Sequence, residues 1–128
     1  MGTLVWAAAE PLDRRLFRHD YSDVALLGKG VTRSRAWPLA GLAVHTANGA
    51  VFGLVYRELR RRRGVTALQL ALAEHTVLFP LGWAADRFHP ARGEPGLAKL
   101  FSWRAFGQAT LRHALFGVVL GRLAQEGE

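Results

Sequence analysis

The stretch AWPLAGLAVHTANGAVFGLVY, residues 36–56, decides the expected fold because it carries no formally charged residue. At about 1.5 Å of rise per helical residue, it would span about 30 Å, the hydrocarbon thickness of a bilayer. Trp37 and Pro38 open the stretch, as an interfacial aromatic residue and an early helical proline do. Tyr56 and a run of arginines close it. We therefore predict a membrane-spanning helix over residues 36–56.

Small side chains recur on one face of this predicted helix. Gly41, His45, Gly49 and Gly53 follow one another at intervals of four residues, so they form a ridge that contains a single imidazole. Such a ridge allows a second helix to approach closely. It also directs His45 at whatever lies across the contact.

Two further apolar stretches follow. The arginine run and Gly64 predict a tight turn, after which residues 65–85 form an antiparallel helix with Glu74 and His75 near its midpoint. A last helix is expected from Trp103 to about residue 124, interrupted by Arg112. Residues 1–9 are apolar but too short to span a bilayer. The chain is therefore expected to be all-α, a membrane bundle of about four helices of which the first is short.

The polar connections contain one further expected element. Ser22 is placed to cap a short helix through residues 24–27, and Gly28 and Gly30 are expected to end it. Residues 86–102 carry several prolines and glycines and are expected to be irregular.

Composition limits the classes of function. The 128 residues predict a single domain and include no cysteine, which excludes disulfides, thiolate metal sites and thiol catalysis. The net charge of +7 arises mostly from arginines at the ends of apolar runs, where positive residues meet lipid head groups, so nucleic-acid binding is not favoured. All four tryptophans lie at apolar boundaries, as in an aromatic belt. Abundant Arg and Ala indicate GC-rich coding, and we expect a bacterial inner (plasma) membrane protein.

An internal repeat relates the two halves of the chain, residues 1–63 and 64–128. His45, Gly49 and Gly53 are matched in spacing by His113, Gly117 and Gly121, and each set follows a Trp-Ala-Ala segment and a basic loop. The repeat predicts two helical hairpins in one bundle, with the two histidine helices parallel and their imidazoles facing a common cavity. The short first helix leaves two alternatives: either this helix is truncated, or another chain completes the bundle, as in a homo-oligomer.

Four interpretations of the polar residues in the apolar runs stay open. In the first, Asn48, Glu74 and Arg112 form a buried network that only fixes packing, with Glu74 paired to Arg112. In the second, Glu74 and His75 bind a metal ion together with the other histidines. In the third, His45 and His113 are axial ligands of a flat cofactor such as haem. In the fourth, Glu74 and His75 exchange protons in a small transporter.

Motifs for catalysis are not evident, since the sequence contains no nucleophile elbow, phosphate loop or complete metal signature. The expected function is therefore that of a structural or assembly subunit of a membrane complex or homo-oligomer. The alternatives are a cofactor- or metal-binding membrane protein and a proton-path subunit.

Overall fold

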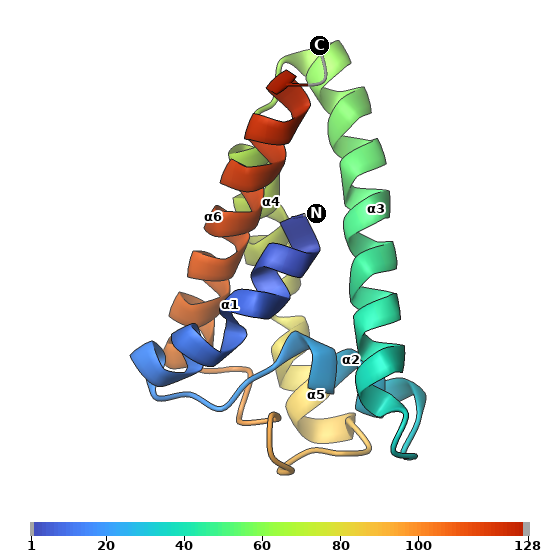
Figure 1. Cartoon of the computed structure of the whole chain (residues 1–128). Coiled ribbons are helices and arrows are strands. Elements are labelled where there is room, and N and C mark those ends of the chain that lie inside the picture. The colour runs from blue at the N-terminus through green and yellow to red at the C-terminus, as the bar shows by residue number, and fades with distance from the viewer. Residues whose placement is uncertain (1, 127–128) are drawn as a thin grey trace.

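The computed structural model describes residues 2–126 of the chain, and they fold into helices joined by short turns and two longer connections (Figure 1). The all-α prediction is confirmed, but the described residues form six helices rather than about four. Their bounds are α1 Gly2–Phe17, α2 Asp23–Val31, α3 Trp37–Arg63, α4 Ala67–Leu78, α5 Leu81–Phe88 and α6 Trp103–Glu126.

Helix α3 begins at Trp37, as predicted, and carries Pro38 in its first turn. It continues past Tyr56 through the arginine run to Arg63, where Gly64 ends it with a left-handed φ of 65° and an N–H bond to the Arg60 carbonyl. Among helices within residues 2–126, α3 alone is long and apolar enough to cross a membrane by length and composition.

The predicted helix over residues 65–85 is divided. Thr66 and Gln69 form a reciprocal capping box that starts α4, which then ends at Leu78. Pro80 lies between α4 and α5. A proline has no N–H to donate, and its ring crowds the preceding turn of a helix. The prediction of one continuous helix over residues 65–85 was therefore wrong. This division accounts for one of the additional helices.

Helix α2 accounts for the other. Ser22 caps it as predicted, since its Oγ accepts a hydrogen bond from the Ala25 N–H at 3.2 Å. The predicted end was wrong, because Gly28 and Gly30 lie inside the helix, which runs to Val31. Tertiary contact overrides the helix-ending preference of glycine here: the Gly28 backbone packs directly against the first turn of α3.

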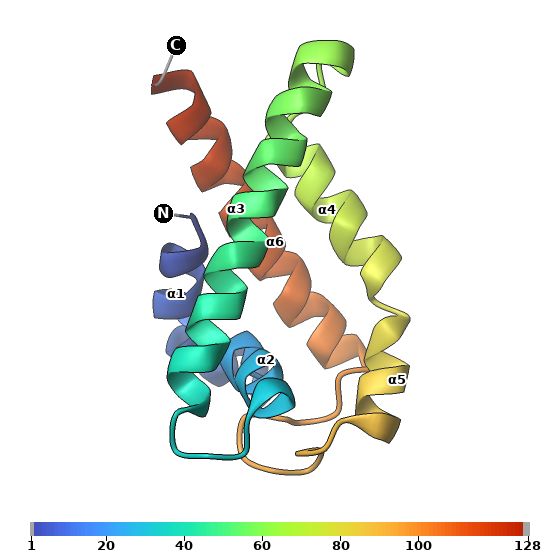
Figure 2. The same ribbon diagram turned by 90° about the vertical axis from the view of Figure 1, so that its right-hand side faces the viewer.

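The helices pack in pairs. α2 packs against α3, α4 packs against α6, and α1 contacts both α6 and α3. α3 and α6 run in the same direction from their tryptophan ends (Figures 1 and 2). The apolar core gathers side chains from four of these helices: Trp6, Phe52, Tyr56, Ala67, Ala71 and Phe116.

Glycines allow two of these helix pairs to approach closely. A Cβ atom at Gly41 would lie 2.0 Å from the Val24 carbonyl oxygen, and one at Gly117 would lie 2.7 Å from the Cα atom of Leu68. Two glycines farther along the predicted ridges are looser: a Cβ atom at Gly121 would lie 3.8 Å from Ala67, and one at Gly53 would meet nothing within 4 Å. The helices therefore approach more closely at Gly41 and Gly117 than at Gly53 and Gly121.

The two connecting segments bind each other below the bundle. Tyr21 and Leu97 form an antiparallel bridge, and the Ala98 N–H donates to the Asp20 carbonyl at 2.9 Å. The Gly96 N–H donates to the Asp20 carboxylate at 2.8 Å, and Arg14 forms an ion pair with the same carboxylate. The hydrogen bond from Gly96, followed by that from Arg14, lowers the pKa of Asp20 below its ordinary value.

This shifted pKa predicts a pH-dependent contribution to stability. Because the folded-state pKa is depressed, the stabilising effect of Asp20 is present above its unfolded-state value of about 3.9 and is lost as pH falls through the lower, folded value. Asp20→Asn should reduce the free energy of unfolding by about 0.5–1 kcal/mol at pH 6, a modest effect because the site is partly exposed. The difference in stability between Asp20→Asn and wild type should become smaller towards pH 3, as measured by thermal unfolding followed by circular dichroism. An equal difference at pH 6 and pH 3 would exclude a role for the Asp20 charge.

Candidate functional site

A cavity of about 430 Å³ lies between α3 and the α4–α6 pair, and every helix contributes to its wall. Most of the wall is apolar or aromatic, including Trp6, Phe52, Phe79 and Phe116. The polar side chains on the wall are those of Tyr21, Asp23, His45, Asn48, Glu74, His75 and His113. An apolar pocket with a few convergent polar groups is the usual form of a small-molecule site.

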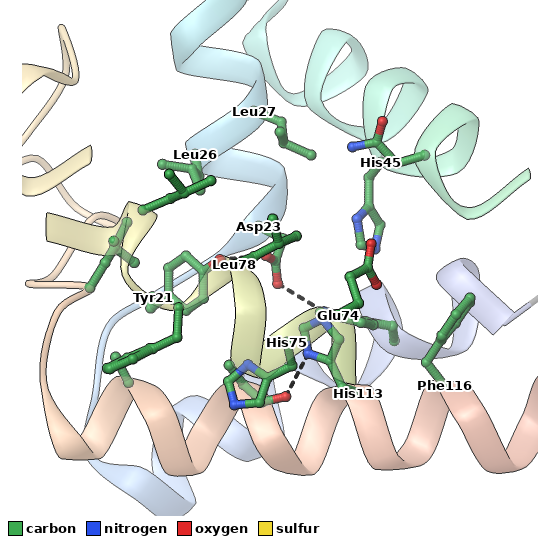
Figure 3. Close-up of a pocket in the computed structure, with 18 of the residues that line it drawn as sticks. Tyr21, Asp23, Leu26, Leu27, His45, Glu74, His75, Leu78, His113 and Phe116 are labelled. Carbon is green, nitrogen blue, oxygen red and sulfur yellow. Dashed lines mark hydrogen bonds between the residues drawn. The ribbon is translucent and has the colours of Figure 1, made fainter. Parts of the chain in front are cut away.

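Three histidines from three helices meet around this cavity (Figure 3). The ring centroids of His75 and His113 lie 4.9 Å apart. The Trp6 indole packs edge-on against both His45, at 5.2 Å, and His113, at 4.7 Å. The structure thus brings together the two histidines that the sequence placed in corresponding positions.

Hydrogen bonds assign roles to the nitrogens of two of these rings. His113 Nδ1 donates to the Ala109 carbonyl at 2.8 Å, which leaves Nε2 as the acceptor in the neutral ring. Thr110 donates its hydroxyl hydrogen to the Phe106 carbonyl, so its oxygen accepts from His75 Nε2 at 2.9 Å. Helix α6 therefore holds both rings in place.

His45 and Glu74 are the buried and half-buried side chains of the wall for which the described residues supply no hydrogen-bond or ion-pair partner. His45 is 7 % exposed, and its Nε2 atom is buried without a hydrogen-bond partner. The Glu74 carboxylate, half-buried in α4, has no ion-pair or hydrogen-bond partner among residues 2–126. In Figure 3 both side chains project into the space between α3 and α4. Unpaired polar groups in an apolar wall carry a free-energy cost that a bound ligand can relieve.

The metal and haem interpretations find limited support in this geometry. Within the described residues, no three His, Asp or Glu side chains are arranged to hold a metal ion, so Glu74 and His75 do not form a complete site. The free Nε2 of His113 suits a metal ligand. However, the contact of Trp6 with both the His45 and His113 rings favours a packed aromatic cluster over a pair of axial ligands.

Arg112 lies in a buried network on a neighbouring face of α6. It is 1 % exposed and binds Asp13 through two nitrogens, Asp23 Oδ2 at 2.7 Å and the Tyr21 carbonyl at 2.9 Å. Glu10 lies 3.7 Å away from the same guanidinium group. Three carboxylates from the first 23 residues therefore surround one arginine near the end of the chain.

This network differs from the predicted one of Asn48, Glu74 and Arg112. Arg112 pairs with Asp13 and Asp23 rather than with Glu74, and Asn48 is an exposed residue at the cavity wall. Successive residues of a helix point about 100° apart, so Arg112 faces α1 while His113 faces the cavity. Sequence reasoning missed Asp13 and Asp23; the signal available was the need of an arginine in an apolar helix for nearby carboxylates.

Trp6 also departs from the prediction. It is 6 % exposed, and its Nε1 donates to Asp23 Oδ2 at 2.9 Å, so it is a core residue and not part of an interfacial belt. Trp83 and Trp103 are exposed, as an interfacial position requires.

Comparison with protein-family models, curated proteins and solved structures finds no match for the chain.

Proposed function

We propose that the protein is a small, non-enzymatic membrane helical bundle that binds a small, largely apolar molecule between its helices. The observation that carries this proposal is the cavity, whose wall combines aromatic side chains with the unpartnered His45 and Glu74. The proposed location is a bacterial inner membrane, with the lipid bilayer as the surrounding partner.

The outer surface supports the membrane part of the proposal. Large apolar side chains are exposed on α3, α4 and α6, and a lipid bilayer would cover them whereas water would not. They are Leu39, Val51, Leu54 and Val55 on α3, Leu68 and Val77 on α4, and Leu111, Val118 and Leu123 on α6.

The second candidate function is assembly, as a subunit of a homo-oligomer or of a larger membrane complex. The observation in its favour is the outward face of α3, where Ala43, Ala47 and Ala50 are exposed. Small residues on an exposed helix face allow another membrane helix to pack closely. Assembly and ligand binding are compatible, since they use different surfaces of α3.

A substitution that fills the cavity with a large side chain tests the proposed function. Gly49 lies on the cavity wall, whereas Gly53, one turn along α3, does not. The wild-type protein should require detergent for extraction from membranes and should then bind 4-phenylbutan-1-ol, a neutral probe with an aromatic body. Gly49→Phe should weaken this binding at least about tenfold by occupying the cavity, and the matched Gly53→Phe should bind like wild type.

Binding is measured by isothermal titration calorimetry in detergent, with protein-free micelles as the blank and circular dichroism as the check on folding. Equal binding by both variants would contradict the cavity as the site. Recovery of a monodisperse protein without detergent would contradict the membrane location.

A further inference from the structure

The charge of the cavity points to a class of ligand. We infer that the cavity binds a lipophilic amine, whose ammonium group pairs with Glu74 while its apolar body lies against the aromatic wall. This inference rests on the proposed function and adds the chemical class of the ligand.

Glu74 is the group that selects a cation. The residues of the cavity wall include no Lys or Arg within the described part of the chain, and the other wall carboxylate, Asp23, is already bound by Arg112, Trp6 and Tyr21. The Glu74 carboxyl group thus faces the cavity with no opposite charge beside it among the described residues. An ionised carboxylate is costly in an apolar setting, and a cation that enters with its own apolar body relieves the cost.

His45 supplies the second polar contact. Its ring is more than nine-tenths buried, its Nε2 atom is unpartnered, and in Figure 3 it projects into the same space as Glu74. In the neutral tautomer that carries its hydrogen on Nδ1, the Nε2 atom accepts a hydrogen bond from an ammonium group, which has more donors than one carboxylate uses. In that tautomer Glu74 and His45 together offer two acceptors to one cationic head.

The aromatic wall suits the same head and the body attached to it. Trp6, Phe52 and Phe116 line the cavity. The Phe116 ring packs edge-on against both Trp6 and Phe52, and the ring centroids of Phe52 and Phe116 lie 5.1 Å apart. Aromatic rings attract a cation electrostatically as well as an apolar chain by burial. A fatty acid or another anion would instead face the Glu74 carboxylate and be repelled.

Three probes with one skeleton test the inference: 4-phenylbutylamine, 4-phenylbutan-1-ol and 4-phenylbutyrate. The wild-type protein in detergent should bind the amine about tenfold or more tightly than the alcohol, and the butyrate most weakly. Glu74→Gln keeps the shape of the side chain and removes its charge, so it should abolish the preference for the amine and bring the affinities for the amine and the alcohol together. Glu58→Gln, which removes a carboxylate of α3 paired with Arg61 and Arg62 outside this cavity, should retain the preference.

The outcomes separate the two proposals. Equal affinity for amine and alcohol, or an amine preference that survives Glu74→Gln, would overturn the ligand class and leave the binding cavity in place. Tightest binding of butyrate would overturn it as well. Failure of all three probes to bind the wild-type protein would refute the proposed function itself. Glu74→Gln removes an unpaired charge, so folding of this variant is expected and is checked by circular dichroism.

Discussion

Replacing Arg112 with methionine should reduce the free energy of unfolding by about 3–5 kcal/mol, the largest effect expected of any single substitution discussed here. Methionine preserves much of the side-chain volume, so the loss does not arise from a cavity. It arises because the buried carboxylates of Asp13 and Asp23 would lose their counter-charge while remaining enclosed by α1, α2 and α6. The Gln108 side chain would still donate a hydrogen bond to Asp13, but one such bond is too weak to compensate for the lost positive charge.

The measurement is thermal or urea unfolding in detergent, followed by circular dichroism. Arg122→Met is the matched control, because Arg122 lies on the same helix and is exposed; its loss should change stability by less than about 0.5 kcal/mol. Similar stabilities for the two variants would show that the buried network contributes little. The double variant Asp13→Leu/Arg112→Met should recover part of the loss, because it removes one of the enclosed carboxylates together with the arginine.

Gly41→Ala and Gly53→Ala should change stability in opposite directions, although both replace a glycine in α3. An alanine Cβ atom at Gly41 would lie 2.0 Å from the Val24 carbonyl and 3.0 Å from the Gly28 backbone nitrogen, a contact that only a shift of the helix axes relieves. We expect a loss of about 2–3 kcal/mol for Gly41→Ala. At Gly53 nothing lies within 4 Å, so alanine should add up to about 1 kcal/mol through its higher helix propensity.

Both variants are compared with wild type in one unfolding series, and intramolecular crosslinking between α2 and α3 reports their separation directly. A stabilising Gly41→Ala, or a destabilising Gly53→Ala of similar size, would contradict the close crossing of α2 and α3. Gly28→Ala gives an independent check, since its Cβ atom would lie 2.0 Å from the Trp37 carbonyl on the other side of the same crossing.

Local features of the fold were predictable from the sequence. The helical class, the start of α3 at Trp37, the cap at Ser22 and the turn at Gly64 each follow from a few neighbouring residues. The division at Pro80 was visible as a proline in an apolar run, but the sequence does not say whether a helix bends or breaks there, because neighbouring helices decide how the freed backbone groups are satisfied.

The partners of the polar residues were not predictable. Glu74 and Arg112 were expected to pair because each is an ionisable residue in an apolar helix, yet α6 turns Arg112 towards α1 and leaves Glu74 at the cavity. The face of α6 that meets α4 is the one that carries Gly117, whose backbone packs against Leu68 in the first turn of α4. His45, His75 and His113 were identified as candidates, but the contact of Trp6 with two of them required coordinates.

The Arg112 network also has a consequence for the order of events during synthesis. Asp13 and Arg112 are 99 positions apart, and Asp23 and Arg112 are 89 apart, whereas the α2–α3 crossing joins Gly28 and Gly41. We therefore expect a chain made from its N-terminus to close α2 on α3 before α6 has been translated, whereas Asp13 and Asp23 gain their arginine only afterwards. In that order of events, α6 is the helix that draws the first segment into place.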